Sequence, residues 1–184
     1  MTEKEIITKV KQAVLDLMIQ KAIPKIRAFE VADRAGISRS TLYRYYSSVD
    51  EIVKEMQHEF FESLREINKY SISDKFDKKQ PEKLLESNKL LFEFMNENRD
   101  FYLAITGPHG DGQFRHKERM LVREYYGGKM AYEGLTNEFT EATLVFAIAG
   151  HEALIDYWIR QRPDIPPAVV ASLAQKLMYG MFLL

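Results

Sequence analysis

The sequence predicts an all-α protein. Apolar residues recur at the three- and four-residue spacing of amphipathic helices through most of the 184 residues. No segment of useful length alternates between apolar and polar residues, as a strand with one buried face would. Two helix starts are marked by capping boxes at residues 2–5 and 48–51, where a hydroxyl residue is followed three positions later by Glu. The expected architecture is a small N-terminal three-helix unit followed by a larger helical body.

The first capping box predicts a helix that buries Ile6, Val10 and Val14 and closes at Pro24. Two shorter helices are expected at residues 28–35 and 39–45, joined by a turn at Gly36, where a residue without Cβ adopts a positive φ at little cost. Ser38 is expected to cap the second short helix. The apolar residues expected to bury the contact between these two helices are Val31, Ala35, Ile37, Leu42 and Tyr45.

The second capping box opens a long amphipathic helix, expected at residues 49–68. A polar segment at 70–82, which contains Pro81, precedes the other helices of the body. Those helices are expected at 81–98, 101–106, 113–126, 136–160 and 167–183, with a glycine-bearing loop at 107–112. We therefore expect one domain at residues 1–48 and a second at residues 49–184.

Charge is distributed unevenly along the chain, whose formal net charge is −1. Between Lys4 and Arg44, nine basic residues outnumber four acidic residues, which gives +5 for this stretch and leaves −6 for the remainder. A basic N-terminal segment on an acidic body is typical of a nucleic-acid-binding protein.

The segment 35–51 has an unusual outward face. After the buried positions are removed, the residues that point outward are Arg39, Ser40, Thr41, Tyr43 and Arg44. Hydroxyl groups donate to phosphate oxygens, and guanidinium groups pair with phosphates or with guanine edges. An α-helical hairpin with an incidentally polar face would share the Ala-x-x-x-Gly spacing. The agreement of the buried positions, the Ser38 cap and the basic balance favours a DNA-binding helix-turn-helix over that alternative.

The same residues carry a family resemblance. The stretch "FEVADRAGISRSTLYRYYSSVDEIV" (29–53), within about residues 5–60, resembles the DNA-binding domain of the TetR family of transcriptional regulators. The resemblance implies that Thr41 and Tyr43 contact phosphates, and that Arg39, Ser40 and Arg44 lie nearest the bases. The sequence departs from the family at Val49, where the family has a phosphate-binding lysine, and around residues 26–27, where it has a threonine. The predicted DNA-binding residues are Arg27, which supplies a compensating charge, with Ser38, Arg39, Ser40, Thr41, Tyr43 and Arg44.

The body resembles, through residues 97–114 and 146–174, a C-terminal domain found on many TetR-like regulators. Some regulators of this type respond to small molecules and others activate through protein contacts, and the resemblance leaves both open. Most aromatic residues of the body are expected to pack in the core, and some are expected to line a cavity for a small apolar or aromatic effector. The candidate cavity residues are Asn88, Phe92, Met95, Tyr102, Phe114, Tyr125, Phe146 and His151.

The last two helices are expected to pack partly inside the monomer and to form a two-fold homodimer, through residues 136–160 and 167–183. Small residues, which let helices approach closely, are interspersed with large apolar residues there, and the segment 177–184 is strongly apolar. The small residues are Gly150, Ala153, Ala171, Ala174 and Gly180. The TetR resemblance implies the same interface.

Nothing in the sequence indicates catalysis, a metal site or a cofactor. The chain has no cysteine, so disulfides and thiolate metal ligands are excluded. His151 and Glu152 begin an incomplete HExxH motif, because Ile155 occupies the position of the second histidine. The charged N-terminus is unlike a signal peptide, and no window approaches about 18 uncharged apolar residues. We expect a cytoplasmic protein that is not an enzyme.

Together these features predict a homodimeric DNA-binding transcriptional regulator. The expected activity is repression through a palindromic operator, with release controlled by a small-molecule effector. The alternative is a TetR-like co-activator that acts through a protein partner.

Overall fold

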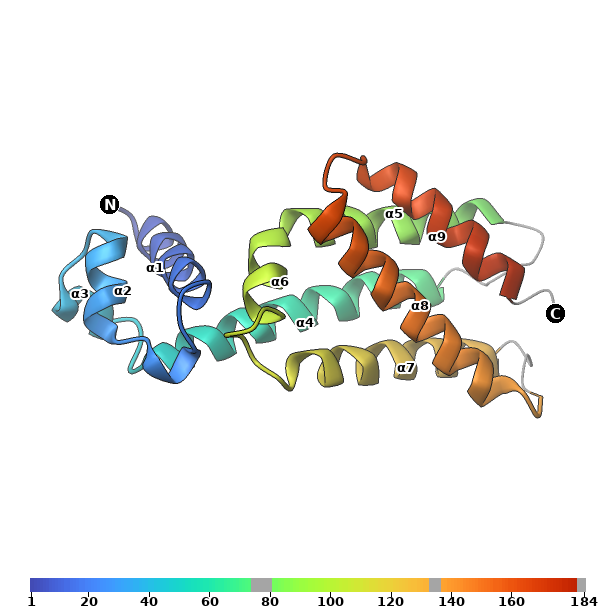
Figure 1. Ribbon diagram of the computed structural model, residues 1–184, viewed down its shortest axis with the longest axis horizontal. Helices are drawn as coiled ribbons and strands as arrows, with labels where there is room; N and C mark the ends of the chain where they lie inside the picture. Colours follow the sequence, from blue (N-terminus) through green and yellow to red (C-terminus); the bar gives the residue numbers. More distant parts are fainter. Residues whose placement is uncertain (74–80, 133–136, 182–184) are drawn as a thin grey trace. The chain divides into compact units, whose positions relative to one another are not determined.

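The computed structural model describes residues 1–73, 81–132 and 137–181, and the side chains of all of these except residues 70–73, 81–84, 129–132 and 178–181. These residues form α-helices and one short 3₁₀ helix, and the described part of the chain contains no strand (Figure 1). The predicted all-α class is confirmed. The helices gather into two compact units, one formed by residues 1–62 and 100–115, the other by 63–99 and 116–184.

The first unit begins with α1 (Glu3–Met18), whose capping box is present as predicted. The Thr2 hydroxyl accepts a hydrogen bond from the Glu5 amide (3.3 Å), and the Glu5 carboxylate accepts one from the Thr2 amide (2.7 Å). The apolar face of α1 is buried and packs against α2 (Ala28–Ala35). The helix ends at Met18, earlier than predicted, and Pro24 lies in the separate 3₁₀ helix Ile23–Lys25.

The first unit continues through α3 (Arg39–Tyr43) into α4 (Val49–Ser73), which extends beyond the predicted residue 68. Only half of the predicted capping box is present at the start of α4. Ser48 Oγ accepts from the Glu51 amide (3.1 Å), but the Glu51 carboxylate accepts from the amide and hydroxyl of Ser47 (2.6 and 2.7 Å). Ser47, the residue before the predicted cap, therefore supplies the two donors that bind the Glu51 carboxylate.

An aromatic cluster joins α4 to α6 (Arg99–Ile105) within the first unit. The ring of Phe60 lies 5.2 Å from that of Phe101, and the ring of Phe61 stacks on Phe114 at 5.0 Å. All four rings are buried. The loop after α6 is held to α4 by Gln57, which donates to the Asp111 carboxylate (3.0 Å).

The second unit contains α5 (Pro81–Glu97), most of α7 (Phe114–Tyr132), α8 (Thr140–Gln161) and α9 (Pro167–Met181), with the last turns of α4. α9 runs along α5, and α8 packs against both (Figure 1). Trp158 is buried and its indole N–H donates to the Ile165 carbonyl (2.8 Å), which closes the connection between α8 and α9. The Arg99 guanidinium donates to the carbonyl of Ile159 at 2.9 Å.

Helix α8 is the one described helix that is long and apolar enough to cross a membrane by length and composition, with a mean hydropathy of 1.2 over its best window. From the sequence, no window was expected to approach this composition. The core helix of a globular unit satisfies the same test, and 39% of this window is buried inside the protein. The composition of α8 is therefore weak evidence for a membrane span.

Candidate nucleic-acid interface and effector cavity

The turn between α2 and α3 has the geometry that the sequence predicts. Gly36 ends α2 in the left-handed region, with φ 67° and ψ 36°, and the next amide, that of Ile37, donates to the Ala32 carbonyl (3.0 Å). Val31, Ala32 and Leu42 are almost fully buried between the helices. This part of the first unit is a helix-turn-helix whose short second helix has one buried face and one exposed face.

The start of α3 carries a cluster of hydroxyl groups. Ser38 is the N-cap, as predicted, and its Oγ accepts from the Thr41 amide at 3.0 Å. The same Oγ lies 2.8 Å from the hydroxyl of Ser40 and 2.8 Å from that of Thr41. The Ser38 hydroxyl is therefore committed to the cap, and the cluster as a whole faces outward from the first turn of the helix.

The end of α3 differs from the prediction. The helix ends at Tyr43, and Arg44 is its C-cap. Tyr46 is buried in the position expected of Tyr45, which is only half-buried. The Tyr46 hydroxyl donates to the Glu55 carboxylate at 2.9 Å, so this side chain links the turn after α3 to α4.

The predicted DNA-binding residues are mostly exposed in the first unit. Six of the predicted DNA-binding residues are exposed, and Thr41 is half-buried. Among the described residues, no carboxylate forms an ion pair with the predicted guanidinium groups of Arg27, Arg39 and Arg44. A fixed, unneutralised guanidinium is available for a phosphate or a base edge.

Other basic side chains of this unit are already paired. Lys21 pairs with Glu30 (2.5 Å), and Arg34 pairs with Asp16 (3.3 Å). Since each of these cations has an acidic partner, the excess of +5 counted along the sequence belongs mostly to the remaining side chains, including the arginines around α3.

A network of half-buried and exposed charges links α1 to the start of α4. Lys11 binds Glu55 (2.8 Å) and Glu59 (2.7 Å). Burial alone would lower the pKa of Lys11, but the hydrogen bonds and attraction of the two carboxylates outweigh burial and raise it. Burial raises the pKa of Tyr46 above its usual range, together with the nearby Glu55, so its hydroxyl stays protonated and remains a donor. This network holds the base of the helix-turn-helix in place.

Phe29 is a feature of the interface that the sequence analysis missed. Its ring is 50% exposed on α2, and the Arg39 guanidinium lies over it at 5.1 Å from the centroid. A guanidinium at this distance is attracted by the ring face. The sequence did show a large aromatic residue at an outward position of α2. It could not show that Arg39 lies over this ring, because that contact depends on how α2 and α3 cross.

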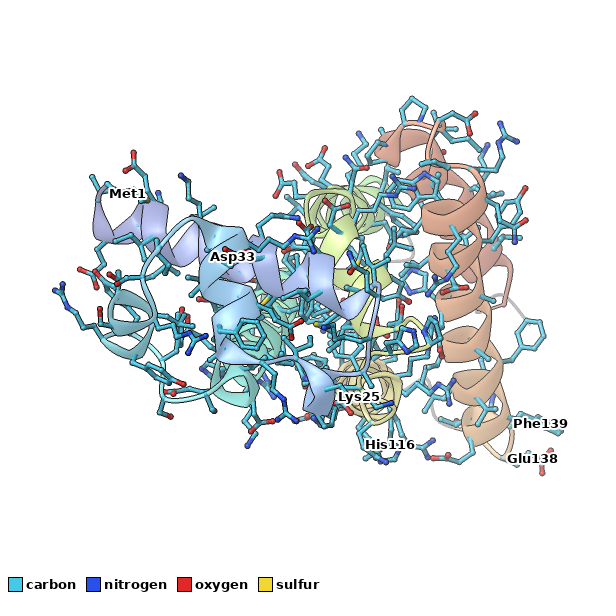
Figure 2. All side chains as sticks on the ribbon, turned by 60° about the vertical axis from the view of Figure 1, so that its left-hand side comes forward. Met1, Lys25, Asp33, His116, Glu138 and Phe139 are labelled. Carbon is cyan, nitrogen blue, oxygen red and sulfur yellow. The ribbon has the colours of Figure 1, made fainter. Side chains whose placement is uncertain are left out.

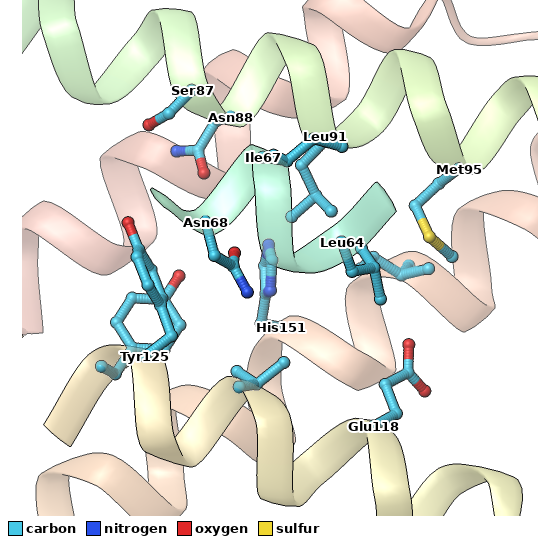
Figure 3. A pocket seen from close by; sticks show the side chains of 13 residues that line it. Leu64, Ile67, Asn68, Ser87, Asn88, Leu91, Met95, Glu118, Tyr125 and His151 are labelled. Atoms are coloured by element: carbon cyan, nitrogen blue, oxygen red, sulfur yellow. The ribbon is translucent and has the colours of Figure 1, made fainter. Parts of the chain in front are cut away.

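The second unit contains a partly open pocket between α4, α5, α7 and α8, with a cavity volume of about 40 Å³ (Figure 3). Four predicted cavity residues line it: Asn88, Met95, Tyr125 and His151. The other four do not. Phe92 is buried with its ring 5.7 Å from that of His151, and Phe146 is 68% exposed on α8. Tyr102 and Phe114 belong to the first unit, where they pack with the aromatic cluster.

The cavity contains polar side chains that the sequence analysis did not include, among them Asn68, Ser87 and Glu118. His151 is 7% exposed, and burial lowers its pKa to about 4, so its imidazole is neutral at pH 7. Neither His151 Nε2 nor Asn88 Nδ2 has a hydrogen-bond partner, and both atoms are fully buried. Because these residues come from four helices, sequence spacing alone does not bring them together.

Large apolar side chains are exposed on α8 and α9. Val145, Phe146, Val169, Leu173 and Leu177 are each between 47% and 68% exposed. Phe139, just before α8, also projects away from the ribbon (Figure 2).

Ala171 and Ala174, which the sequence analysis assigned to a contact between subunits, are at most 1% exposed and lie in the core. Helix α9, which carries them, packs against α5 and α8. Gly150 and Ala153 are exposed, whereas residues 178–181, including Gly180, lie outside the described side chains, and 182–184 lie outside the described residues altogether.

The described residues contain no group of three or more His, Asp or Glu side chains that could hold a metal ion. Glu152, from the incomplete motif, is bound instead by the Arg119 guanidinium at 2.6 and 3.0 Å.

Comparisons with known proteins agree with both halves of this description. The family model described as "Bacterial regulatory proteins, tetR family" matches residues 12–56, and the model described as "Transcriptional regulator C-terminal region" matches residues 82–180. A comparison with curated proteins found no significant match.

Several solved structures share the fold. A TetR-like transcriptional regulator from Rhodococcus sp. RHA1 is 18% identical, with a TM-score of 0.70 over 94% of this chain and 92% of that chain. The fatty acid degradation regulator FadR from Bacillus halodurans is 12% identical, with a TM-score of 0.67 over 95% of both chains. The dihydroxyacetone kinase operon activator DhaS is 17% identical, with a TM-score of 0.61 over 97% of this chain and 96% of that chain.

Proposed function

Because this chain belongs to the TetR family of bacterial transcriptional regulators, we propose that it represses transcription by binding a palindromic operator as a homodimer. The observation that carries this proposal is the outward face of α3. There, Arg39 and Arg44 flank a cluster of hydroxyl groups, and neither arginine has an acidic partner among the described residues. Hydroxyl groups and unpaired guanidinium groups on one short helix suit the major groove of DNA.

Two copies of this helix are needed for specific affinity, because one short recognition helix buries too little DNA surface. The exposed apolar side chains of α8 and α9 support a two-fold contact between subunits. In such a dimer the two α3 helices would enter successive major grooves, about 34–36 Å apart.

We infer that a small molecule bound in the cavity of the second unit controls DNA binding. Leu64, Ile67 and Asn68 of α4 line that cavity, and the first turns of the same helix belong to the unit with the helix-turn-helix. A ligand that binds better to one tilt of α4 than to another would change the separation of the two α3 helices. It shifts the DNA-binding equilibrium only as far as its affinities for the two states differ.

The test is footprinting of the purified protein on the DNA upstream of its own gene, followed by gel-shift titration of the protected fragment. We expect two protected half-sites related by a two-fold axis and separated by about one helical turn. Arg39→Ala and Arg44→Ala should weaken binding. Glu93→Ala, which removes an exposed side chain of α5 in the second unit, should leave it unchanged. A single protected half-site, or no protection at any salt concentration, would argue against the proposal.

A second candidate is a co-activator that acts mainly through a protein partner. The observation in its favour is Val49, which is buried at the start of α4 where the family resemblance leads us to expect a phosphate-binding lysine. With one phosphate contact fewer, intrinsic DNA affinity is lower. Weak footprinting that becomes strong only when a second regulator is added would favour this candidate.

A further inference from the structure

Asn88 and His151 each bring into the second-unit cavity a buried polar atom that has no hydrogen-bond partner. Asn88 is 6% exposed and His151 is 7% exposed, and the unpartnered atoms are Asn88 Nδ2 and His151 Nε2. Asn88 projects from α5 and His151 from α8 into the same space (Figure 3). A buried polar atom left without a partner costs free energy, so such atoms are uncommon unless something fills the space beside them.

The chemistry of these atoms restricts what can occupy the cavity. The amide Nδ2 of Asn88 is a donor and requires an acceptor. The neutral imidazole of His151 presents either a donor or an acceptor at Nε2, depending on its tautomer. A hydroxyl group donates and accepts, so one hydroxyl group beside each atom satisfies both, whichever tautomer is present. An alkyl or aromatic group would leave both atoms unpaired.

Charge further restricts the ligand. None of the thirteen described lining residues is Lys or Arg, whereas the carboxyl group of Glu118, 8% exposed, is among them. An anionic ligand would therefore be desolvated without a counter-charge and close to a carboxyl group. An ammonium ligand would place donors against the Asn88 donor. A neutral molecule fits best.

Size gives the last restriction. A buried water needs about 10–15 Å³ of such a cavity, so a volume of about 40 Å³ accommodates roughly three groups of that size. Sites for drug-sized molecules are about 300–1,000 Å³. A long acyl chain therefore requires the helices to separate, whereas a molecule with about three hydroxyl-bearing carbons needs little rearrangement.

We propose that the cavity binds a small neutral polyhydroxyl compound, with hydroxyl groups hydrogen-bonded to Asn88 and His151. This inference rests on the proposed function, since it names the chemical class of the effector. It differs from the apolar or aromatic effector that the sequence suggested, because the unpartnered atoms became visible only when the four helices were assembled.

The experiment uses three probes of similar size and different chemistry: glycerol, 1-propanol and glycerate. Binding to the full-length protein is measured by isothermal titration and by the NMR shift of the His151 ring. We expect glycerol to bind and to shift the His151 resonance. 1-Propanol and glycerate should each bind at least about tenfold more weakly, which is about 1.4 kcal/mol. Preferential binding of 1-propanol or glycerate, or no shift with glycerol because only water fills the cavity, would overturn the inference.

Two asparagine variants separate a ligand-binding role from a structural one. Asn88→Leu removes the unpartnered donor at similar volume. It should abolish glycerol binding and leave the melting temperature unchanged or raise it by about 2–4 °C. Asn98→Leu is the matched control, because the Asn98 amide already donates to the Phe94 carbonyl (2.9 Å). It should leave glycerol binding within about twofold and should not raise the melting temperature. An Asn88→Leu protein that still binds glycerol would overturn the inference.

Operator binding of the same proteins, measured without any ligand, keeps the two proposals distinct. Intact operator binding with no response to glycerol would refute the ligand class and leave the DNA-binding proposal standing. Glycerol binding by a protein that protects no DNA would support the ligand class and refute the DNA-binding proposal.

Discussion

Burial of His151 makes the stability of this protein depend on pH in a defined window. Desolvation lowers the pKa of His151 to about 4 from the ordinary value of 6.5. The unfolded chain therefore binds a proton at this residue more readily than the folded chain does. The free energy of unfolding should fall as the pH falls from about 6.5 towards about 4, and the contribution of His151 should be fully present above that window.

The size of the effect follows from the two pKa values. At about pH 5.5, the unfolded histidine is mostly protonated and the folded one mostly neutral. The difference corresponds to a loss of about 1.4 kcal/mol relative to about pH 8. This is a substantial share of the roughly 5–15 kcal/mol by which a domain of ordinary size is stable.

The measurement is urea unfolding of the wild-type protein and of His151→Gln at both pH values. Glutamine keeps a polar side chain in the cavity but does not titrate. Other titrating groups contribute equally to both proteins, so the difference between the two pH-dependent losses isolates His151. We expect the wild type to lose about 1.4 kcal/mol more than the variant between about pH 8 and pH 5.5. Equal losses in the two proteins would refute the reasoning that His151 is desolvated and neutral when folded.

Three other predictions concern the interface and the subunit contact. Arg39→Ala or Arg44→Ala should cost roughly 1–3 kcal/mol and relax preference at one base position per half-site. If both variants only flatten the salt dependence on a set of single-base operator variants, both arginines bind phosphates alone. Phe29→Ala should weaken operator binding by about 0.5–1 kcal/mol, because it removes the ring under the Arg39 guanidinium. In a double-mutant cycle this loss should disappear when Arg39 is already alanine, and a loss that persists would show that Phe29 acts without Arg39. Phe146→Asp should dissociate the dimer in sedimentation while circular dichroism stays helical, since the side chain is exposed, whereas Ala171→Asp should unfold the second unit. A dimeric Phe146→Asp protein would place the subunit contact elsewhere.

Much of the helix-turn-helix was predictable from the sequence, although Ile37 and Tyr45, which were expected to be buried, are half-buried. The turn at Gly36, the cap at Ser38 and the burial of Val31 and Leu42 all occur as predicted. Each depends on atoms a few residues apart along the chain, such as the bond from the Thr41 amide to the Ser38 hydroxyl. Where the prediction was off by a residue, as at Tyr45 and Tyr46, the deciding contact was with Glu55 on another helix.

Pattern alone did not decide which face of the last two helices points inward. Ala171 and Leu173 are close in the sequence, yet the small residue is buried and the large one is 47% exposed. A stripe of small residues indicates that something approaches closely, but it does not say whether the neighbour is another helix of the same chain or a second subunit. In this protein α9, which carries Ala171, packs against α5 and α8 of the same chain.

What the sequence by itself determined was the all-α class, the helix-turn-helix and the outward face of α3, because helix periodicity, capping and turn chemistry operate between residues that are near neighbours in the chain. What only the tertiary structure decided was the pairing of Phe29 with Arg39 and the addition of Asn68, Ser87 and Glu118 to the cavity that Asn88 and His151 line. Those contacts join residues on different helices. Their existence depends on helix crossing and side-chain packing, which no local pattern specifies.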